Sequence, residues 1–266
     1  MAIQKKGPKL SGKVGDKIYA AVKSGTVVKG QSKKEHKLSE GSARSGKDLA
    51  EVSTHSKNVR LAYVNMVKDY GDDELYHRLN ARFYDVIRPL PKMMQGKKKV
   101  KDGDISALVG FQFNTQCTLN NLLFRIPNVH VDTSGILTID LQVGNTENIT
   151  AAIAGFNQVM LQLSVLSYDF NTANSSLTKM GDLVGSTLKS AKKKIELDLS
   201  GELLLLVVIG VQYVVNGYRS YSKDKFAAGI THAFVFKDGK PVVFKPVLEK
   251  AEQKVEANNN ELAWDE

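Results

Sequence analysis

The sequence predicts a mainly β protein of the α+β class, with an N-terminal β-hairpin and a helical hairpin followed by an antiparallel β-sandwich. Three patterns predict this class: glycines among β-branched residues near the N-terminus, apolar residues at helical spacing from 42 to 90, and alternation of apolar and polar residues beyond 105. The changes of pattern divide the chain into a basic N-terminal arm with a β-hairpin (1–35), a helical hairpin (36–91), a lysine-rich linker (92–104), the β-sandwich (105–248) and an acidic C-terminal tail (249–266).

The first segment contains a near match to a phosphate-binding loop. The eight residues GPKLSGKV, 7–14, differ from GxxxxGK[ST] by one side chain, since Val14 stands where a magnesium-binding hydroxyl belongs. Only six residues precede Gly7, and they do not read as a buried strand. The β-branched and aromatic residues of 17–29 flank a turn at 23–26, so we expect a glycine-punctuated hairpin in place of a nucleotide site.

Two helices are expected next. Apolar side chains fall on one face of residues 42–70, and a second apolar stripe runs from Leu75 to Leu90, where Pro89 and Pro91 end it. The acidic residues 72–74 between them suit the start of a helix, and we interpret them as capping residues and not as a catalytic pair. The lysine-rich residues that follow lie between prolines and an Asp-Gly pair, which predicts an exposed linker between two domains.

The C-terminal half reads as a series of short strands. Residues 203–215 are almost entirely apolar, as in a strand covered on both faces, and they stop at Asn216-Gly217, a strong hairpin signal. A second such turn is expected at Asp238-Gly239. We expect strands at 107–113, 137–143, 159–165, 195–199, 203–215, 230–236 and 242–248. Strand order and closure into a barrel stay open at this point.

The residue types argue against several classes of protein. A single cysteine, Cys117, excludes a disulfide framework and a thiolate metal cluster. The five histidines, 36, 55, 77, 130 and 232, have no metal-ligand spacing, and no GxSxG turn surrounds a serine. We therefore predict no catalytic residue, no metal site, no cofactor and a protein that is not an enzyme. The longest apolar run is too short to cross a bilayer, and Lys5-Lys6-Gly7-Pro8 is unlike a signal peptide, which predicts a soluble protein of a reducing compartment.

Charge is divided unevenly along the chain. The net charge is +9, and the first 35 residues carry nine lysines against Asp16 and Glu35, which leaves +7 there. The tail has six carboxylates against Lys250 and Lys254, which leaves −4. The arm is therefore suited to an acidic partner, either nucleic acid or the tail of a neighbouring copy, although charged ends also serve solubility alone.

The N-terminal residues resemble a known family. Gly12-Lys13-Val14-Gly15 with Ile18, the hairpin residues 25–29, a helical stretch and a β-rich C-terminal half are similar to uncharacterised Bacteroidota proteins that open with a GKVG-plus-hairpin segment. This sequence has Val22 where the family pattern has a tryptophan, and it adds a lysine-rich arm. The resemblance implies an architecture and no chemistry, and it implies that Gly12 and Gly15 shape a backbone turn in which a side chain would clash.

These observations favour a non-enzymatic structural or interaction protein, a subunit of a virion or of another bacterial assembly. Its partners would be copies of itself or other subunits, and head-to-tail contacts between arm and tail would build rings or filaments. We expect it in the cytoplasm, or in the assembly after release. The predicted interaction residues are basic in the arm, glycine in its turn, and acidic or aromatic in the tail: Lys5, Lys6, Lys9, Lys13, Gly12, Gly15, Glu261, Trp264, Asp265 and Glu266.

Two alternatives stay open. The lysines of the arm and of the linker could bind nucleic acid through its phosphates, without base readout, because arginine and aromatic residues are not interleaved with them. An enzyme with a site assembled from distant residues is the other alternative, with tyrosines such as 213, 218 and 221 as a sugar platform, although these are more simply strand residues.

Overall fold

The structure is a computed structural model that describes residues 2–4, 11–22, 24–30, 37–70, 72–123, 126–132, 134–141, 156, 158–185 and 191–246. The chain separates into two compact units, residues 1–43 and 44–266. The boundary between them falls in the first turn of the first helix. The elements confirm the predicted α+β class with antiparallel sheets, and the sheets do not close into a barrel.

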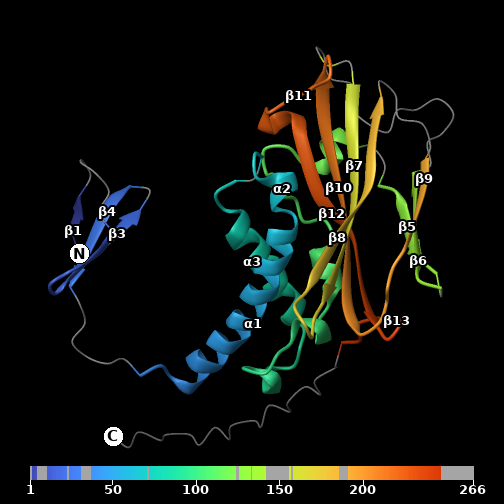
Figure 1. Cartoon of the computed structure of the whole chain (residues 1–266). Helices are drawn as coiled ribbons and strands as arrows, with labels where there is room; N and C mark the ends of the chain where they lie inside the picture. Colours follow the sequence, from blue (N-terminus) through green and yellow to red (C-terminus); the bar gives the residue numbers. More distant parts are fainter. Residues whose placement is uncertain are drawn as a thin grey trace, which may run out of the picture. The chain divides into compact units, whose positions relative to one another are not determined.

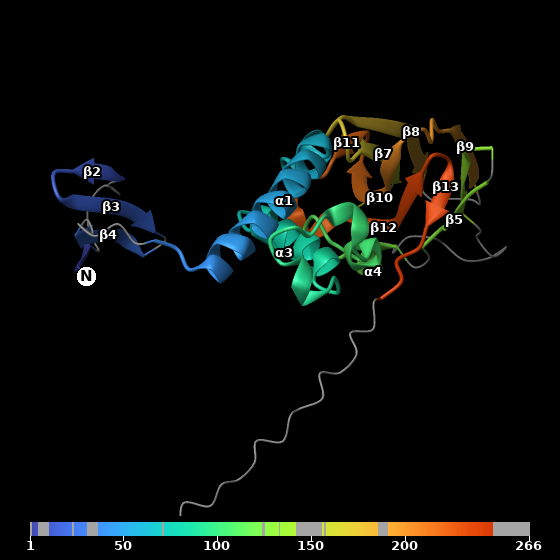
Figure 2. The same ribbon diagram turned by 90° about the horizontal axis from the view of Figure 1, so that it is seen from below.

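The smaller unit is a four-stranded antiparallel sheet in the order β1-β4-β3-β2 (Figures 1 and 2). The expected hairpin is formed by β3 and β4, with Val22 opposite Gly25. A second hairpin joins β2 to β3, with Val14 opposite Lys17. The strands are β1 (Ala2–Gln4), β2 (Gly12–Val14), β3 (Lys17–Val22) and β4 (Gly25–Gly30).

The larger unit begins with the expected helical hairpin. The long first helix is α1 (Glu40–Ala62), the single-turn α2 (Val64–Val67) follows it after a break at Tyr63, and α3 (Leu75–Ile87) returns. The capping expected of residues 72–74 is not made at the N-cap of α3, because the side chain of Glu74 forms no cap hydrogen bond. Asp72 instead orders the turn before the helix, where its Oδ1 accepts a hydrogen bond from the backbone N–H of Glu74 at 2.9 Å. Asp72 also forms an ion pair with Arg78 of α3, with 2.6 Å between Oδ2 and Nη2, so it stabilises the connection between the helices.

The rest of this unit is built on two antiparallel sheets. The larger has the order β13-β12-β10-β7-β8, with the short β11 paired to β10, and the smaller has the order β5-β6-β9 (Figure 1). The strands of the larger sheet are β7 (Gln158–Asp169), β8 (Ser175–Gly185), β10 (Glu202–Val215), β11 (Tyr218–Arg219), β12 (Phe226–Lys237) and β13 (Lys240–Val242). Those of the smaller are β5 (Asn128–Val131), β6 (Ile136–Leu141) and β9 (Ala191–Glu196).

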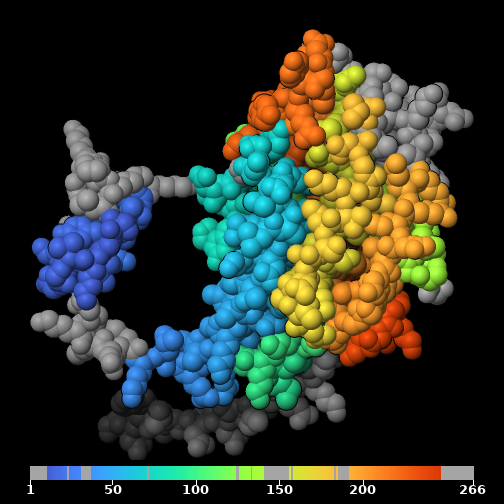
Figure 3. Space-filling model, viewed as in Figure 1, coloured from blue at the N-terminus to red at the C-terminus, as the bar shows by residue number. Residues whose placement is uncertain are grey.

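The helices and the small sheet cover opposite faces of the large sheet (Figures 1 and 2). On the helical face, Val59 and Phe83 pack with Leu206 in one core. On the other face, Ile139 of β6 packs with Val207 in a second core. Side chains alternate along a strand, so successive residues of β10 enter the two cores in turn, which explains why its sequence is apolar throughout. Figure 3 shows α1 lying directly along the outer strands of this sheet.

Both predicted two-residue turns are present. Asn216 and Gly217 have positive φ values of 49° and 83°, and Asp238 and Gly239 have 48° and 79°. Positive φ at both central residues is the requirement of a type I′ hairpin turn, which Asn-Gly and Asp-Gly pairs satisfy at little cost. These turns connect β10 to β11 and β12 to β13.

The strand predicted at 107–113 is wrong. The segment begins with a 3₁₀-helix, Ile105–Leu108, because the Asp104 carboxylate accepts a hydrogen bond from the backbone N–H of Ser106 and caps it. Gly110 then takes a φ of +83°, which interrupts an extended chain. The alternation of apolar and polar residues over 107–113 therefore belongs to a loop, and this loop buries Phe111 and Phe113 under the helices.

The strands predicted at 195–199 and 242–248 are displaced. Ile195 belongs to β9, which ends at Glu196, and Leu197 and Leu199 follow the strand as buried or half-buried loop residues. At the other position β13 ends at Val242, and the chain continues without strand pairing to Pro246.

Residues 92–104 are not an exposed linker between two domains. They lie inside the larger unit, and Val100 is fully buried in the helical core. Gly103 fits so closely against α3 that a Cβ atom there would lie 2.2 Å from the backbone oxygen of Val86. The sequence does not predict these two packed positions, because a single buried valine among lysines produces no periodic pattern of apolar residues.

Candidate functional site

The described part of the near match to a phosphate loop, residues 11–14, leads into a β-hairpin. Gly12, Lys13 and Val14 form β2, and Gly15 with Asp16 turns the chain into β3, so no helix follows the glycines. A phosphate loop depends on a helix N-terminus that presents backbone amides to the anion. The geometry of this hairpin therefore gives no phosphate site of that kind.

The two glycines are needed for their backbone angles and not for space. Gly15 has a φ of +60° and Gly12 a φ of +128°, conformations that side chains disfavour. A Cβ atom at either position would meet nothing within 4 Å. The expectation that a side chain would clash there is therefore corrected: the constraint is torsional.

Each face of the N-terminal sheet carries an exposed aliphatic side chain beside lysines. Pairing places Lys13, Ile18 and Lys29 in one cross-strand row and Val14 and Lys17 in a row on the opposite face. Val14 is 68% exposed and Ile18 is 40% exposed, although both are aliphatic.

Few side chains of this sheet are sheltered. Among the described residues of the sheet, only Thr26 is buried. A small sheet of this kind normally gains its stability by burying one face against another layer.

Of the other predicted interaction residues, the structure describes only Lys13. Lys13 is exposed, beside Ile18 on the sheet. Lys5, Lys6 and Lys9 of the arm, and Glu261, Trp264, Asp265 and Glu266 of the tail, lie outside the described residues. Their roles stay predictions.

Three lysines of residues 92–104, at positions 98, 99 and 101, make side-chain contacts within the protein. Lys98 Nζ donates to the backbone oxygens of Ile87 and Leu90, at 3.2 and 2.8 Å, where α3 ends. Lys99 Nζ lies 2.9 Å from Glu51 Oε2, and Lys101 Nζ pairs with Glu202. Contacts of this kind compete with binding of phosphates, so this part of the nucleic-acid hypothesis loses support.

A polar cluster that the sequence did not predict joins α1 to β7. His55 Nδ1 lies 2.7 Å from the Tyr168 hydroxyl, and His55 Nε2 lies 3.2 Å from Glu51 Oε1. The Asn58 amide donates to the same hydroxyl at 3.2 Å. A neutral His55 satisfies all three contacts if Nε2–H donates to Glu51 and the Tyr168 hydroxyl donates to Nδ1.

The electrostatics agree with that protonation state. Burial lowers the pKa of His55 below its ordinary value, and the hydrogen bond to Glu51 offsets only part of this effect. Burial alone would raise the pKa of Glu51, but hydrogen bonds from Lys99 and His55 outweigh it, so the carboxylate stays ionised. Burial also raises the pKa of Tyr168. The cluster is thus a neutral imidazole between a neutral phenol and a carboxylate–ammonium pair.

This arrangement suits stabilisation better than catalysis. Tyr168 is 0% exposed and His55 is 8% exposed, so a substrate has little access to the hydroxyl or the ring. A hollow of about 610 Å³ is lined by Glu51, His55 and Tyr168 of the cluster together with Lys47, Lys99 and Lys101, but the small exposed fractions show that little of the ring or the hydroxyl faces it. The sequence signal for this cluster was the Glu51–His55 pair at helical i,i+4 spacing, but its partner Tyr168 is 113 residues away from His55.

Other candidate residues are dispersed. Within the described part of the chain, no three His, Cys, Asp or Glu side chains are grouped to hold a metal ion. Burial raises the pKa of Cys117, which lowers its reactivity. Tyr213 is buried, whereas Tyr218 and Tyr221 are exposed, so these three do not form one exposed platform. None of the helices in the described ranges is both long and apolar enough to span a bilayer.

Comparisons with known proteins found no match: no family model fits the chain, and no curated protein and no solved structure is similar to it. The resemblance to Bacteroidota proteins stays a prediction from the N-terminal residues.

Proposed function

We propose that the protein is a non-enzymatic subunit of a larger assembly and that its N-terminal sheet is buried between neighbouring copies. The observation that carries this proposal is the exposure of aliphatic side chains on both faces of a small, separate sheet. Val14 and Ile18 lie on opposite faces, and both are accessible to a partner. Full burial of an aliphatic side chain stabilises by about 1.5–3 kcal/mol, so a contact on each face gives the sheet the stability that it lacks alone.

The charges beside these side chains indicate the kind of partner. Lys13 and Lys29 flank Ile18 in one row, and the first 35 residues carry a net charge of +7. The C-terminal residues 249–266 of a neighbouring copy carry −4 and complement them. Such pairs set partner choice and association rate more than affinity, so we assign the affinity to the apolar contacts.

The assembly would be built head to tail. A contact between different surfaces of identical subunits generates a ring or a filament, as in a virion shell or another bacterial structure. The outer strands of the sheet, β1 and β2, have one strand partner each among the described residues, and an extended segment of a neighbour can pair with such an edge as a second means of contact.

The test is the oligomeric state of the full chain, measured by light scattering on a sizing column at low and high salt. We expect an assembly that Ile18→Lys dissociates to monomers, because the variant replaces the apolar side chain between Lys13 and Lys29 with a third ammonium group at the contact. The matched control is Val184→Lys on β8, a valine that is 54% exposed in the larger unit and should leave the assembly intact.

Three results would contradict the proposal. The wild-type chain could be a monomer at every concentration and salt, or both variants could dissociate it equally. A monomer whose ratio of absorbance at 260 and 280 nm falls when salt is raised would instead support nucleic-acid binding by the arm.

A further inference from the structure

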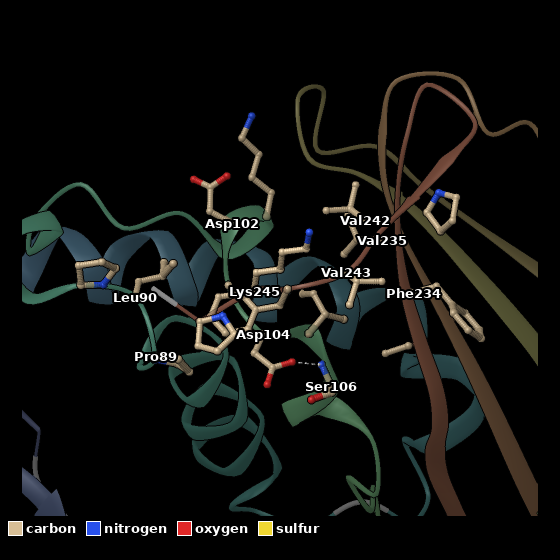
Figure 4. A pocket seen from close by; sticks show the side chains of 18 of the residues that line it. Pro89, Leu90, Asp102, Asp104, Ser106, Phe234, Val235, Val242, Val243 and Lys245 are labelled. Carbon is tan, nitrogen blue, oxygen red and sulfur yellow. Dashed lines mark hydrogen bonds between the residues drawn. The ribbon is translucent and has the colours of Figure 1, made fainter. Parts of the chain in front are cut away.

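The larger unit has an apolar groove away from the polar cluster. It holds about 930 Å³ and lies between the residues that follow α3, the turn at 102–106, and the β12–β13 end of the large sheet. Figure 4 shows Leu90 and Pro89 on one side, Val242 and Val243 on the other, and Lys245 between them. Val243 is 77% exposed and Val242 is 45% exposed, so the groove offers apolar surface to a ligand.

The floor of this groove includes a strand edge with no paired strand. β13 pairs with Val235, Phe236 and Lys237 of β12, and the loop before α4 (Leu119–Leu122) forms backbone hydrogen bonds with Ala228 and Ile230. Between these contacts, residues 232–234 pair with β10 on one side; on the other side no strand of the described part of the chain pairs with them, and the 3₁₀-helix Ile105–Leu108 packs against β12. An extended segment that enters the groove can pair with this edge while its side chains enter the apolar hollow.

The segment most favourably placed to enter is the end of the same chain. We infer that residues 261–266 bind in the groove, with Trp264 as the anchor and Leu262 beside it. The last described residue, Pro246, itself lines the groove, and 20 residues follow it. The 14 residues 247–260 span up to about 45 Å when extended, which is ample for the chain to return.

Tethering favours this occupant over a separate protein. A short flexible connection gives the segment an effective concentration of the order of 1 mM at the groove. The same segment on another copy is present only at the protein concentration, which is far lower in a dilute solution. The groove is therefore filled within one chain unless the intramolecular geometry is poor.

The spacing in this segment suits an extended conformation. Its sequence is ELAWDE, and in a strand alternate side chains point to the same side, so Leu262, Trp264 and Glu266 share one side while Glu261 and Asp265 face solvent on the other. Leu262 and Trp264 therefore enter the groove together, and Glu266 has to remain at its solvent-exposed end. This orientation keeps the carboxylates of Glu261 and Asp265 away from Asp104, whose side chain caps Ser106 at the groove (Figure 4).

Lys245 provides the complementary cation. Its side chain lies across the groove, and an ammonium group over an indole face is attracted by the ring electrons (Figure 4). Asp102 also lines the groove, so the carboxylates of the segment have no net attraction to its walls and the apolar contacts decide binding.

The experiment uses the only tryptophan of the chain as the reporter. Emission of Trp264 and its quenching by acrylamide are measured in the full chain over a range of dilute concentrations. We expect blue-shifted emission and severalfold weaker quenching than in the urea-unfolded chain, both independent of protein concentration. Val243→Asp should return both readouts to the unfolded-chain values, because it places a carboxylate in the apolar contact. The matched control, Val184→Asp on β8, should change neither.

Each other outcome overturns the inference. Emission and quenching equal to those of the unfolded chain mean that Trp264 is not bound. Protection that survives Val243→Asp places the tryptophan elsewhere, and protection that grows with concentration assigns it to a second copy. Because Val243 is mostly exposed, circular dichroism should show that its variant folds, and Lys245→Glu gives a second test of the same groove through the loss of the cation.

Discussion

Replacing Tyr168 with phenylalanine isolates the polar cluster between α1 and β7. The ring stays in the core, and only the hydroxyl that contacts His55 and Asn58 is lost. The ring also packs edge-on against His55 and Phe170, contacts that phenylalanine preserves. The change therefore tests the hydrogen bonds separately from the packing.

The expected loss of stability depends on whether His55 and Asn58 can form other hydrogen bonds once the hydroxyl is removed. His55 is 8% exposed, so its Nδ1 is left without a replacement for the lost donor, at a cost of about 1–3 kcal/mol. Asn58 is half-buried and its amide can form a hydrogen bond with water instead, so the lost contact at Asn58 lowers the free energy of unfolding by less. We expect a decrease of about 2 kcal/mol in the free energy of unfolding, which is a decrease of about 30-fold in the folding equilibrium constant.

The assay is urea unfolding of the full chain at neutral pH, followed by circular dichroism. Tyr84→Phe is the control, because Tyr84 is an exposed tyrosine of α3, and its variant should stay within about 0.5 kcal/mol of the wild type. Combining Tyr168→Phe with His55→Leu should cost less than the sum of the two changes, since both remove the same contact. A loss at Tyr168 no larger than the loss at Tyr84 would refute the role of the cluster. The oligomeric state should be unchanged in all these variants.

Two further predictions concern packing and pH. Gly103→Ala should destabilise the fold by about 1–3 kcal/mol, because the new Cβ would lie 2.2 Å from the backbone oxygen of Val86. Gly46→Ala in α1 should stabilise it by about 0.5–1 kcal/mol, because a Cβ there meets nothing within 4 Å and alanine favours a helix. Urea unfolding measures both variants, and equal effects would contradict the tight contact at Gly103. Burial lowers the pKa of His55 and of His232 below 6.5, so the unfolded chain takes up protons first on acidification. The stability that the two neutral histidines contribute is therefore fully present above pH ~6.5, and it should be lost as the pH falls through 6.5 toward their lower pKa values in the folded chain. Urea midpoints that stay constant over that pH range would contradict this prediction.

The sequence predicts the N-terminal hairpin, but it predicts neither the apolar groove nor the polar cluster. The hairpin and its glycine turn follow from local chemistry, since a φ of +60° favours glycine and a φ of +128° is essentially restricted to it wherever the chain lies. The apolar groove had no signal in the sequence, because its walls come from residues near 90, 104, 234 and 243. Only the fold brings such distant residues together. The polar cluster was missed for the same reason, with Glu51 and His55 on one helix and Tyr168 on a strand.

The lysine-rich residues 92–104 show where local reasoning fails. Their composition predicts a solvated linker, but Lys98 binds the backbone oxygens at the end of α3 and Val100 fills the core. A lysine with three donors and a long apolar stem can satisfy buried carbonyls as well as it can face water. Composition does not distinguish these two uses, so it predicts an exposed linker where the chain packs into the larger unit.

The sequence by itself determined the α+β class, the two hairpin turns and the strand that is buried on both faces, because turn torsions and side-chain alternation act over a few residues. It also determined the opposite charges of the two ends. Only the tertiary structure decided that residues 92–104 pack into the larger unit, that His55 meets Tyr168, and that an apolar groove opens beside the edge of β12. These contacts join residues far apart in sequence, and their free energy comes from burial that no local pattern records.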